Sequence, residues 1–208
     1  MLVQLFLSAF ITLFVVIDPP GCAPIYAGLV ADATQRQATG MALRAAVIAA
    51  GILVGFALFG AQLLAAMHIE LDSFRIAGGI MLFLLALDMV LDRNTERRSE
   101  RAEAVKASRP VVKDVAVFPM AMPILAGPGS IASIMLLTAR AHGATEMAVI
   151  LAALAMVMVM AFAAMVAARP IIRLLGAQIE AVVTRLLGVL LAALAAQFVI
   201  DGIKGQLF

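Results

Sequence analysis

Two clusters of proline and glycine interrupt apolar stretches that are long enough to cross a membrane, and this limits the fold more than any other feature. The clusters lie at 18–24 and 119–130 and hold six of the eight prolines. Proline removes a backbone donor and disfavours the helical conformation of the preceding residue, so neither stretch is expected to be one unbroken helix. Lipid tolerates irregular backbone only where protein buries it or where it lines a polar cavity. Paired breaks in the two halves of a membrane chain therefore indicate a transport site.

The composition is that of an integral membrane protein. The chain is 64% hydrophobic and 13% charged, with a mean hydropathy of +1.10. A soluble domain carries about 25% charged residues. The single cysteine, Cys22, excludes an internal disulfide and leaves no thiolate cluster for a metal. The start of the chain has neither a basic region nor a small-residue cleavage site, so we expect the first apolar run to remain in the mature protein.

Six apolar segments approach or exceed the length of about 20 residues that a membrane span needs. They lie at 2–30, 41–67, 74–91, 115–139, 146–168 and 182–200. The first is too long for a straight crossing, and its break resolves the excess by kinking the segment or turning it back. The sequence thus predicts an all-α integral membrane protein with six transmembrane segments, of which the first and fourth are broken helices.

The basic residues predict an orientation. Most of the 15 lysines and arginines lie after the first, third and fifth segments. Positively charged loops stay in the cytoplasm, so both termini are predicted on the opposite, outer side. This orientation holds if both broken segments cross the membrane fully.

The chain is also predicted to consist of two inverted three-helix repeats. The first repeat is 1–91, a charged cytoplasmic linker follows at 92–114, and the second repeat is 115–208. Arg75 and Gly78 in the third segment match Arg185 and Gly188 in the sixth in spacing. Because each half makes three crossings, the second enters the membrane from the other side, as in many carriers.

Asp18 is the most informative residue of the first break. An ionisable group at this depth costs at least ~2.5 kcal/mol unless it is paired or hydrated. It is expected either to face a polar cavity and bind a substrate ammonium group, a proton or Na⁺, or to cap a helix that begins at Pro19. The two roles are compatible. The other substrate-binding candidates of this break are Pro19, Gly21 and Pro24.

The second break supplies the matching candidates. These are Pro123, Gly127, Gly129 and Ser130. The two glycines permit positive φ and close backbone approach. Ser130 is expected to open a half-helix whose free N–H groups and positive dipole end favour an anionic group such as a carboxylate. The alternative is a tight turn whose glycines only let neighbouring helices pack.

Two further polar residues lie late in the third and sixth segments. Asp88 and Gln197 are candidate ion-binding or path-lining groups, or else an interfacial residue and an interhelical hydrogen bond. The chain has no catalytic motif and no phosphate-binding loop, so we expect no enzyme and no ATP use. Transport would be passive or driven by a gradient, with H⁺ or Na⁺ as the coupling ion and no other cofactor. No metal site and no nucleic-acid partner are expected.

The two clusters resemble the motifs of the MarC family. Residues Asp18 to Pro24 resemble its Asp-Pro-x-Gly-x-x-Pro motif, and Pro119 to Gly129 resemble its second, proline-rich motif ending in Gly-Pro-Gly. The length, the six segments, the charged central loop and Asp201-Gly202 are similar over the whole chain. The resemblance implies a multi-pass protein of the bacterial inner membrane, in a group also called neutral amino acid transporters. At Pro20, Cys22 and Ala23 the chain departs from relatives that often carry a polar residue.

The sequence and the resemblance together predict a secondary transporter, for uptake or export, of small neutral amino acids. The substrate would lie between the two breaks near the midplane, with Asp18 and the carbonyls near Gly21 facing its ammonium group and the helix from Ser130 facing its carboxylate. An intramembrane enzyme or lipid-handling protein that uses the same cavity is the alternative, with Asp18 and Asp88 as a carboxylate pair. A structural subunit with solidly packed breaks is a third. The expected partners are the amino acid and the lipid bilayer, and a homo-oligomer stays open.

Overall fold

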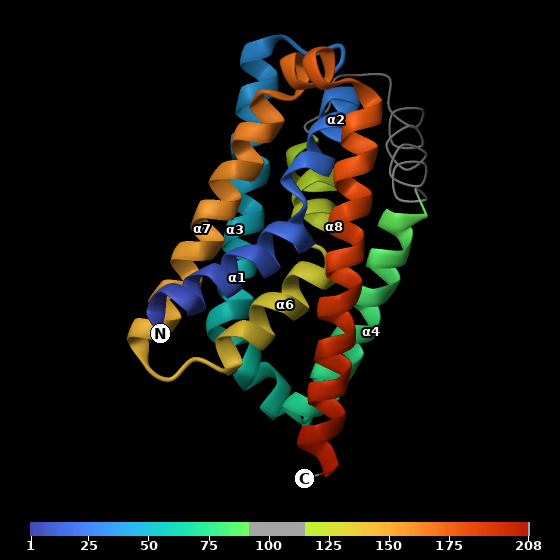
Figure 1. The fold of residues 1–208 in the computed structure, drawn as a ribbon. Helices are drawn as coiled ribbons and strands as arrows, with labels where there is room; N and C mark the ends of the chain where they lie inside the picture. Colours follow the sequence, from blue (N-terminus) through green and yellow to red (C-terminus); the bar gives the residue numbers. More distant parts are fainter. Residues whose placement is uncertain (92–114, 208) are drawn as a thin grey trace.

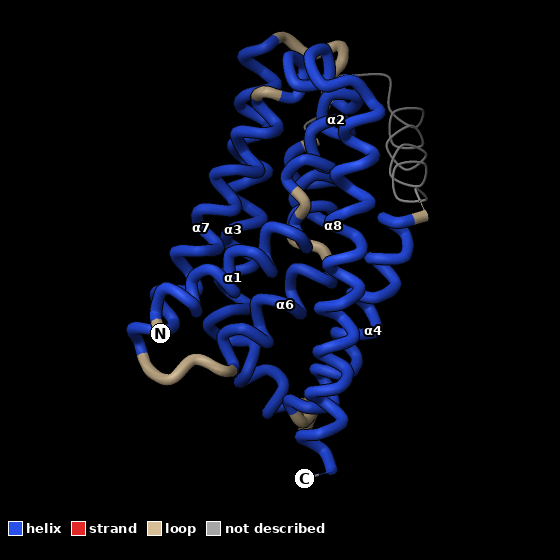
Figure 2. The backbone as a smooth tube through the Cα atoms, in the orientation of Figure 1, coloured by secondary structure: helices blue, strands red, loops and turns tan. Residues whose placement is uncertain are grey.

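The computed structural model describes residues 1–91 and 115–207, and the regular elements within these ranges are all helical (Figure 1). The charged linker predicted at 92–114 lies outside the described residues. The elements are α1 (Leu2–Ile17), α2 (Pro19–Leu29), α3 (Gln35–Ala66), α4 (Leu71–Val90), η1 (Ala116–Leu125), α6 (Pro128–Ala139), α7 (Ala144–Val166) and α8 (Ala168–Leu207). Within each of the two described ranges, short loops or single residues connect neighbouring helices (Figure 2).

Five of these helical stretches are long and apolar enough to cross a membrane. They are Leu2–Leu29, which contains α1 and α2, and then Gln35–Ala66, Leu71–Val90, Ala144–Val166 and Val182–Leu207. The predicted fourth segment is present as η1 followed by α6, which is too short to span alone. The all-α membrane class is confirmed for the described residues, whereas six spans and the inverted repeat stay predictions.

Two helices begin well before the predicted positions. α8 begins at Ala168, so 169–181, expected as a connection, is helical. The reason is that Pro170 falls in the first turn of α8, where a missing N–H costs nothing. α3 begins at Gln35 because Thr34 and Gln37 form a capping box, in which the Thr34 N–H donates to Gln37 Oε1 at 3.0 Å.

The two broken segments lie inside a frame of longer helices. Figure 1 shows α1 and α6 side by side and running in opposite directions, tilted against α3, α7 and α8. α7 packs against α1 and α2, while α4 packs along α8. One buried apolar cluster joins α1, α2, α3, η1, α6 and α7, and a second joins α1, α4, α6 and α8.

Glycines bring α4 and α8 close together. A Cβ atom added at Gly79 would lie 2.9 Å from the carbonyl oxygen of Ala195, and one added at Gly188 would lie 2.9 Å from Cβ of Met89. Small residues that allow such backbone approach are typical of helix pairs in membranes. The α4–α8 pair is therefore closely packed and lies on one side of the broken segments.

Candidate functional site

Asp18 separates α1 from α2. It adopts the left-handed conformation (φ 53°, ψ 64°), and its N–H donates to the carbonyl of Phe14 at 2.9 Å. Its carboxylate oxygen Oδ1 accepts a hydrogen bond from the Gly21 N–H at 3.1 Å, and Pro19 is the first residue of α2. The helix-capping interpretation of Asp18 is thus confirmed, while its ligand role stays a prediction.

Gly21 is required by the position of the Asp18 carboxylate. A Cβ atom at Gly21 would lie 2.7 Å from Cγ of Asp18, closer than such atoms approach. Asp18 itself is only 1% exposed. The glycine of the first motif therefore accommodates the capping carboxylate, which the sequence alone did not indicate.

The prolines of the first break leave main-chain acceptors without helical donors. In a continuous helix the carbonyls of Val15 and Val16 would accept from residues 19 and 20, which are prolines and have no N–H. Pro24 in α2 removes the donor for the carbonyl of Pro20 in the same way. That carbonyls near Gly21 face a substrate stays a prediction, and the carbonyls of Val15 and Val16 were not among the candidates. The pair Pro19-Pro20 is the sequence signal that could have indicated these carbonyls, because neither proline has an N–H group.

The second break begins with the irregular element η1. Phe118 and Met122 each precede a proline and are extended, with φ and ψ of −134° and 126°, and of −131° and 126°. The N–H of Ala126 reaches back five residues to the carbonyl of Ala121 at 3.0 Å. Pro123 follows Met122 within this element, and its backbone belongs to the same wide turns.

The end of the second break starts α6 without a side-chain cap. Gly127 is the N-cap residue with φ −77° and ψ 172°, and Pro128, rather than Ser130, is the first helical residue. Gly127 and Gly129 do not use the positive φ that glycine permits, since among the described glycines only Gly143 has it. The first turn of α6 therefore presents the N–H groups of Gly129 and Ser130 with no capping side chain.

The structure brings the two breaks together. A Cβ atom at Gly129 would lie 3.5 Å from Cγ1 of Val16 and 3.1 Å from Cδ2 of Leu82, which confirms the expected close approach. The last turn of α1 thus touches the first turn of α6. These ends carry partial charges of opposite sign, negative at the end of α1 and positive at the start of α6. Their meeting point is buried, as the small exposed fraction of Ser130 shows.

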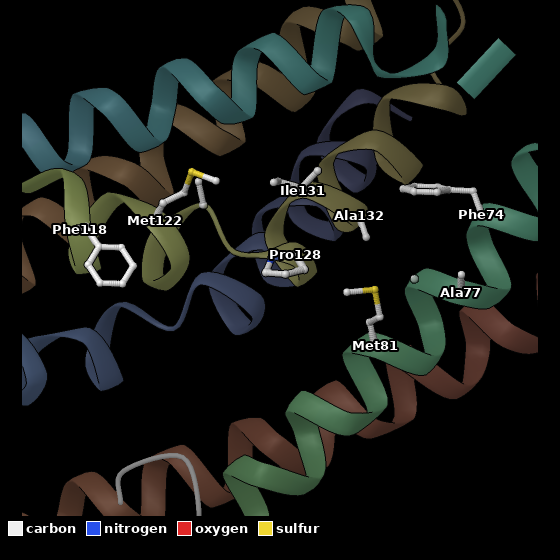
Figure 3. Close-up of a pocket in the computed structure, with 10 residues that line it drawn as sticks. Phe74, Ala77, Met81, Phe118, Met122, Pro128, Ile131 and Ala132 are labelled. Atoms are coloured by element: carbon white, nitrogen blue, oxygen red, sulfur yellow. The ribbon is translucent and has the colours of Figure 1, made fainter. Parts of the chain in front are cut away.

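A cavity of about 560 Å³ opens beside the second break, between α4 on one side and η1 and α6 on the other (Figure 3). Its lining residues are Phe74, Ala77, Gly78, Met81, Phe118, Met122, Ala126, Pro128, Ile131 and Ala132. All of them are apolar. The expectation of a polar, water-sized pocket is therefore not met by this cavity, because α4 presents aromatic and aliphatic side chains to the break.

Asp88 and Gln197 lie apart from this cavity. Asp88 is half-buried in the last turn of α4. Gln197 is exposed on α8, where its Nε2 donates to Asp201 at 2.6 Å. Asp201 also accepts from Arg140, which follows α6, at 2.8 Å. Gln197 thus belongs to a polar cluster that ties α8 to the end of α6, and a path-lining role for either residue stays a prediction.

Comparisons with known proteins assign the chain to a family. The model of the MarC family integral membrane proteins matches residues 3–207. The chain is 32% identical to a UPF0056 membrane protein of Methanocaldococcus jannaschii over 98% of both chains. It is 31% identical to the UPF0056 membrane protein YvbG of Bacillus subtilis, over 99% of this chain and 97% of that one.

The UPF0056 membrane protein YhcE of Escherichia coli is 31% identical, over 94% of this chain and 90% of its own length. None of these three names states a substrate or an activity. No solved structure matches the chain significantly. The match over nearly the whole length agrees with the two motifs that form the meeting point of α1 and α6, and the chain belongs to the MarC family of integral membrane proteins.

Proposed function

We propose that this protein is a secondary carrier of small neutral amino acids. The observation that supports this most is the contact between the end of α1 and the start of α6, seen at Val16 and Gly129. Helix ends of opposite sign meet there in the protein interior. Carriers with discontinuous helices bind charged substrate groups at such ends. A neutral amino acid carries one group of each sign and therefore matches both ends at once.

The ammonium group of the substrate would be held on the α1 side. The carbonyls of Val15 and Val16 lack helical donors, and the carboxylate of Asp18 comes two residues after Val16 in the chain. The carboxylate of the substrate would be held on the α6 side by the N–H groups of Gly129 and Ser130. Each helix end contributes roughly 0.3–1 kcal/mol, and up to about 2 kcal/mol when partly buried.

The same balance of charge favours neutral over charged amino acids. A second charge on the substrate side chain would have no partner at a buried site and would cost at least ~2.5 kcal/mol at membrane depth. This corresponds to roughly two orders of magnitude in affinity. The apolar surroundings of the break thus act against lysine, arginine, aspartate and glutamate.

Alternating access would come from one half of the chain rocking against the other. In Figure 1 the helices of the first half run in directions opposite to their counterparts in the second, and both termini lie toward the same end. This arrangement supports the two inverted repeats. We place both termini on the outer side of a bacterial inner membrane, in accordance with the charge distribution. No catalytic step is proposed.

The test is transport of labelled alanine, serine and threonine in proteoliposomes. We expect uptake or efflux by the wild-type protein, and loss of at least about tenfold in Asp18→Asn and in Gly129→Leu. Gly55→Leu is the matched control, because a Cβ at Gly55 in α3 meets nothing within 4 Å. Unchanged transport in both variants would contradict the assignment of these residues.

The apolar cavity favours a second candidate, a lipid-handling protein. A volume of about 560 Å³ lies within the range of roughly 300–1,000 Å³ of ligand sites. The cavity reaches the second break at Ala126 and Pro128. Lipids that remain bound to the purified protein, detected by native mass spectrometry and lost in Ala77→Phe, would favour this function over amino-acid transport.

A further inference from the structure

An ion pair joins the end of α6 to the C-terminal part of α8. Arg140, the C-cap residue of α6, donates from its Nη2 atom to Oδ2 of Asp201 at 2.8 Å. Gln197, one turn back along α8, donates to the other carboxylate oxygen at 2.6 Å. The helices against which α6 mainly packs are α3, α4 and α1. The ion pair therefore fastens the short helix of the second break to a helix outside its main packing.

A layer of apolar side chains lies next to this ion pair, on the side of the break. Leu136 lies one turn before the arginine in α6, and Phe198 lies three residues before the aspartate in α8. Both belong to the buried cluster that also contains Val16 of α1, and they are 2% and 7% exposed. The same face of α6 continues to Gly129, which meets Val16. From this end of the protein, the α1–α6 contact is thus closed off first by charges and then by apolar side chains.

The ion pair can separate without leaving a buried charge unpaired. The side chains of Arg140 and Asp201 are 50% and 26% exposed, and ion pairs with this much contact to solvent are weak. After separation Asp201 keeps its hydrogen bond from Gln197 and its electrostatic attraction to Arg75 of α4. Arg75 has its own ion pair with Asp72, at 2.5 Å. The link between α6 and α8 therefore suits a contact that opens and closes repeatedly.

The close packing of α4 and α8 determines which side of the link would move. Near the ion pair, a Cβ atom at Gly202 in α8 would lie 2.6 Å from Cγ1 of Ile76 and 2.8 Å from the carbonyl oxygen of Asp72, so these two helices touch up to this end. By contrast, α6 is short and begins at the irregular backbone of the second break. We therefore expect opening to move α6 away from α8, and not to separate α4 from α8.

We propose that the pair Arg140–Asp201, with the apolar layer of Leu136 and Phe198, is a gate of the carrier and is closed in this structure. The proposal deepens the carrier function and rests on it. An open gate admits substrate to the α1–α6 contact from the end of the protein that holds the C-terminus. With the termini placed as above, this is the outer side of the membrane. The gate residues control access and do not bind the substrate.

The test measures how fast a buried thiol behind the gate reacts. Ser133→Cys, in a Cys22→Ala background, places this thiol on the face of α6 between Gly129 and Leu136. Ser133 is 0% exposed, and its hydroxyl has no hydrogen-bond partner among the described residues, so the exchange breaks no such bond. The full-length protein in lipid nanodiscs, without any amino acid, is treated with a charged maleimide that does not enter lipid.

The labelling rate, followed by mass spectrometry, reports the open population. We expect slow labelling while the ion pair is intact, and labelling at least about tenfold faster when Asp201→Ala or Arg140→Gln is added. Glu146→Gln is the matched control, because it removes an ion pair with His142 that lies within one stretch of chain and joins no second helix. This variant should keep the slow rate. Equal labelling with and without the Arg140–Asp201 pair would overturn the proposal.

The native cysteine separates opening of the gate from general loosening of the fold. Cys22 is 0% exposed and belongs to the other buried cluster, with α2, α3 and α7. With Ser133 retained, Cys22 should stay slow to react in Asp201→Ala, and an equal acceleration at Cys22 would also overturn the gate. Because no amino acid is present, the assay is independent of cargo. Labelling that responds while alanine transport fails would support the gate and contradict the proposed substrate.

Discussion

The carboxylate of Asp18 occupies the space that a side chain at Gly21 would need. Its Oδ1 atom accepts from the Gly21 N–H at 3.1 Å, and its Cγ atom lies 2.7 Å from the position of a Cβ atom there. The two residues act as a unit, since the aspartate caps α2 and the glycine makes room for it. The first motif of the family is thus explained in part by helix geometry, before any ligand is considered.

Gly21→Ala is expected to destabilise the protein by about 1–3 kcal/mol, because it displaces a buried charged cap. Gly28→Ala in the same helix should be neutral or stabilising by up to about 1 kcal/mol, because a Cβ at Gly28 meets nothing within 4 Å. Melting temperatures of both variants in detergent check this. Equal melting temperatures would show that the Asp18 carboxylate does not hold this position.

Asp18→Asn and Asp18→Ala should separate capping from charge. Asparagine caps a helix about as well as aspartate, whereas alanine costs about 0.5–2 kcal/mol. We therefore expect Asp18→Asn to fold nearly as well as wild type but to lose transport, and Asp18→Ala to lose both. The measurements are thermal unfolding and proteoliposome uptake. A fully active Asp18→Asn variant would reduce Asp18 to its structural role.

Replacing Pro19 and Pro20 together by alanine lets a continuous helix form through Asp18, in which residues 19 and 20 supply the N–H groups that the carbonyls of Val15 and Val16 lack. Because these acceptors are then satisfied within the chain, transport should fall by about tenfold or more. Stability should change by only about 1 kcal/mol, since proline is tolerated but not required at the start of a helix. Uptake and melting temperature are measured on the same preparation, and retained uptake would argue against a role for these carbonyls.

Gly79→Leu is expected to separate α4 from α8. Its side chain would meet the backbone of α8 at Ala195 and Val199, which cannot yield as a flexible side chain can. Overpacking of this kind costs about 1–3 kcal/mol. Gly55→Leu, which adds the same side chain in open space on α3, is the control, and thermal unfolding is the measurement. A wild-type melting temperature in Gly79→Leu would contradict the tight α4–α8 contact.

Filling the apolar cavity distinguishes the two candidate functions. Ala77→Phe places a ring in the cavity, whose lining includes neither Val16 nor Gly129. If amino acids bind between α1 and α6, their transport should stay within about twofold of wild type. Loss of transport in Ala77→Phe with a normal melting temperature would instead make the cavity part of the substrate path.

The chain pattern predicts most of the helices but not how they pack. Apolar length and proline position locate the spans and both breaks, and Asp18-Pro19 is a local capping signal that holds whatever surrounds it. The helical start of α8 at 168–181 was not predicted, and Pro170 gave no help, because a proline that ends one helix and a proline in the first turn of the next look alike in sequence. Local signals therefore succeed where neighbours in the chain decide the structure.

The candidate site was predictable only in part for the same reason. Gly129 and Val16 are far apart in the chain, and their contact depends on α1 and α6 lying antiparallel. The apolar cavity arises from the side chains that α4 turns toward η1, which no local pattern of either segment contains.

The junction between α7 and α8 has a mechanical consequence. Only Ala167 separates these helices, so their connection is a single residue and has no flexible loop. α7 lies against α1 and α2, and α8 lies against α4, so we expect a tilt of α7 to move the α4–α8 pair as well. A flexible pair of glycines inserted after Ala167 should let the two sides move independently, leaving substrate binding intact while exchange across the membrane slows.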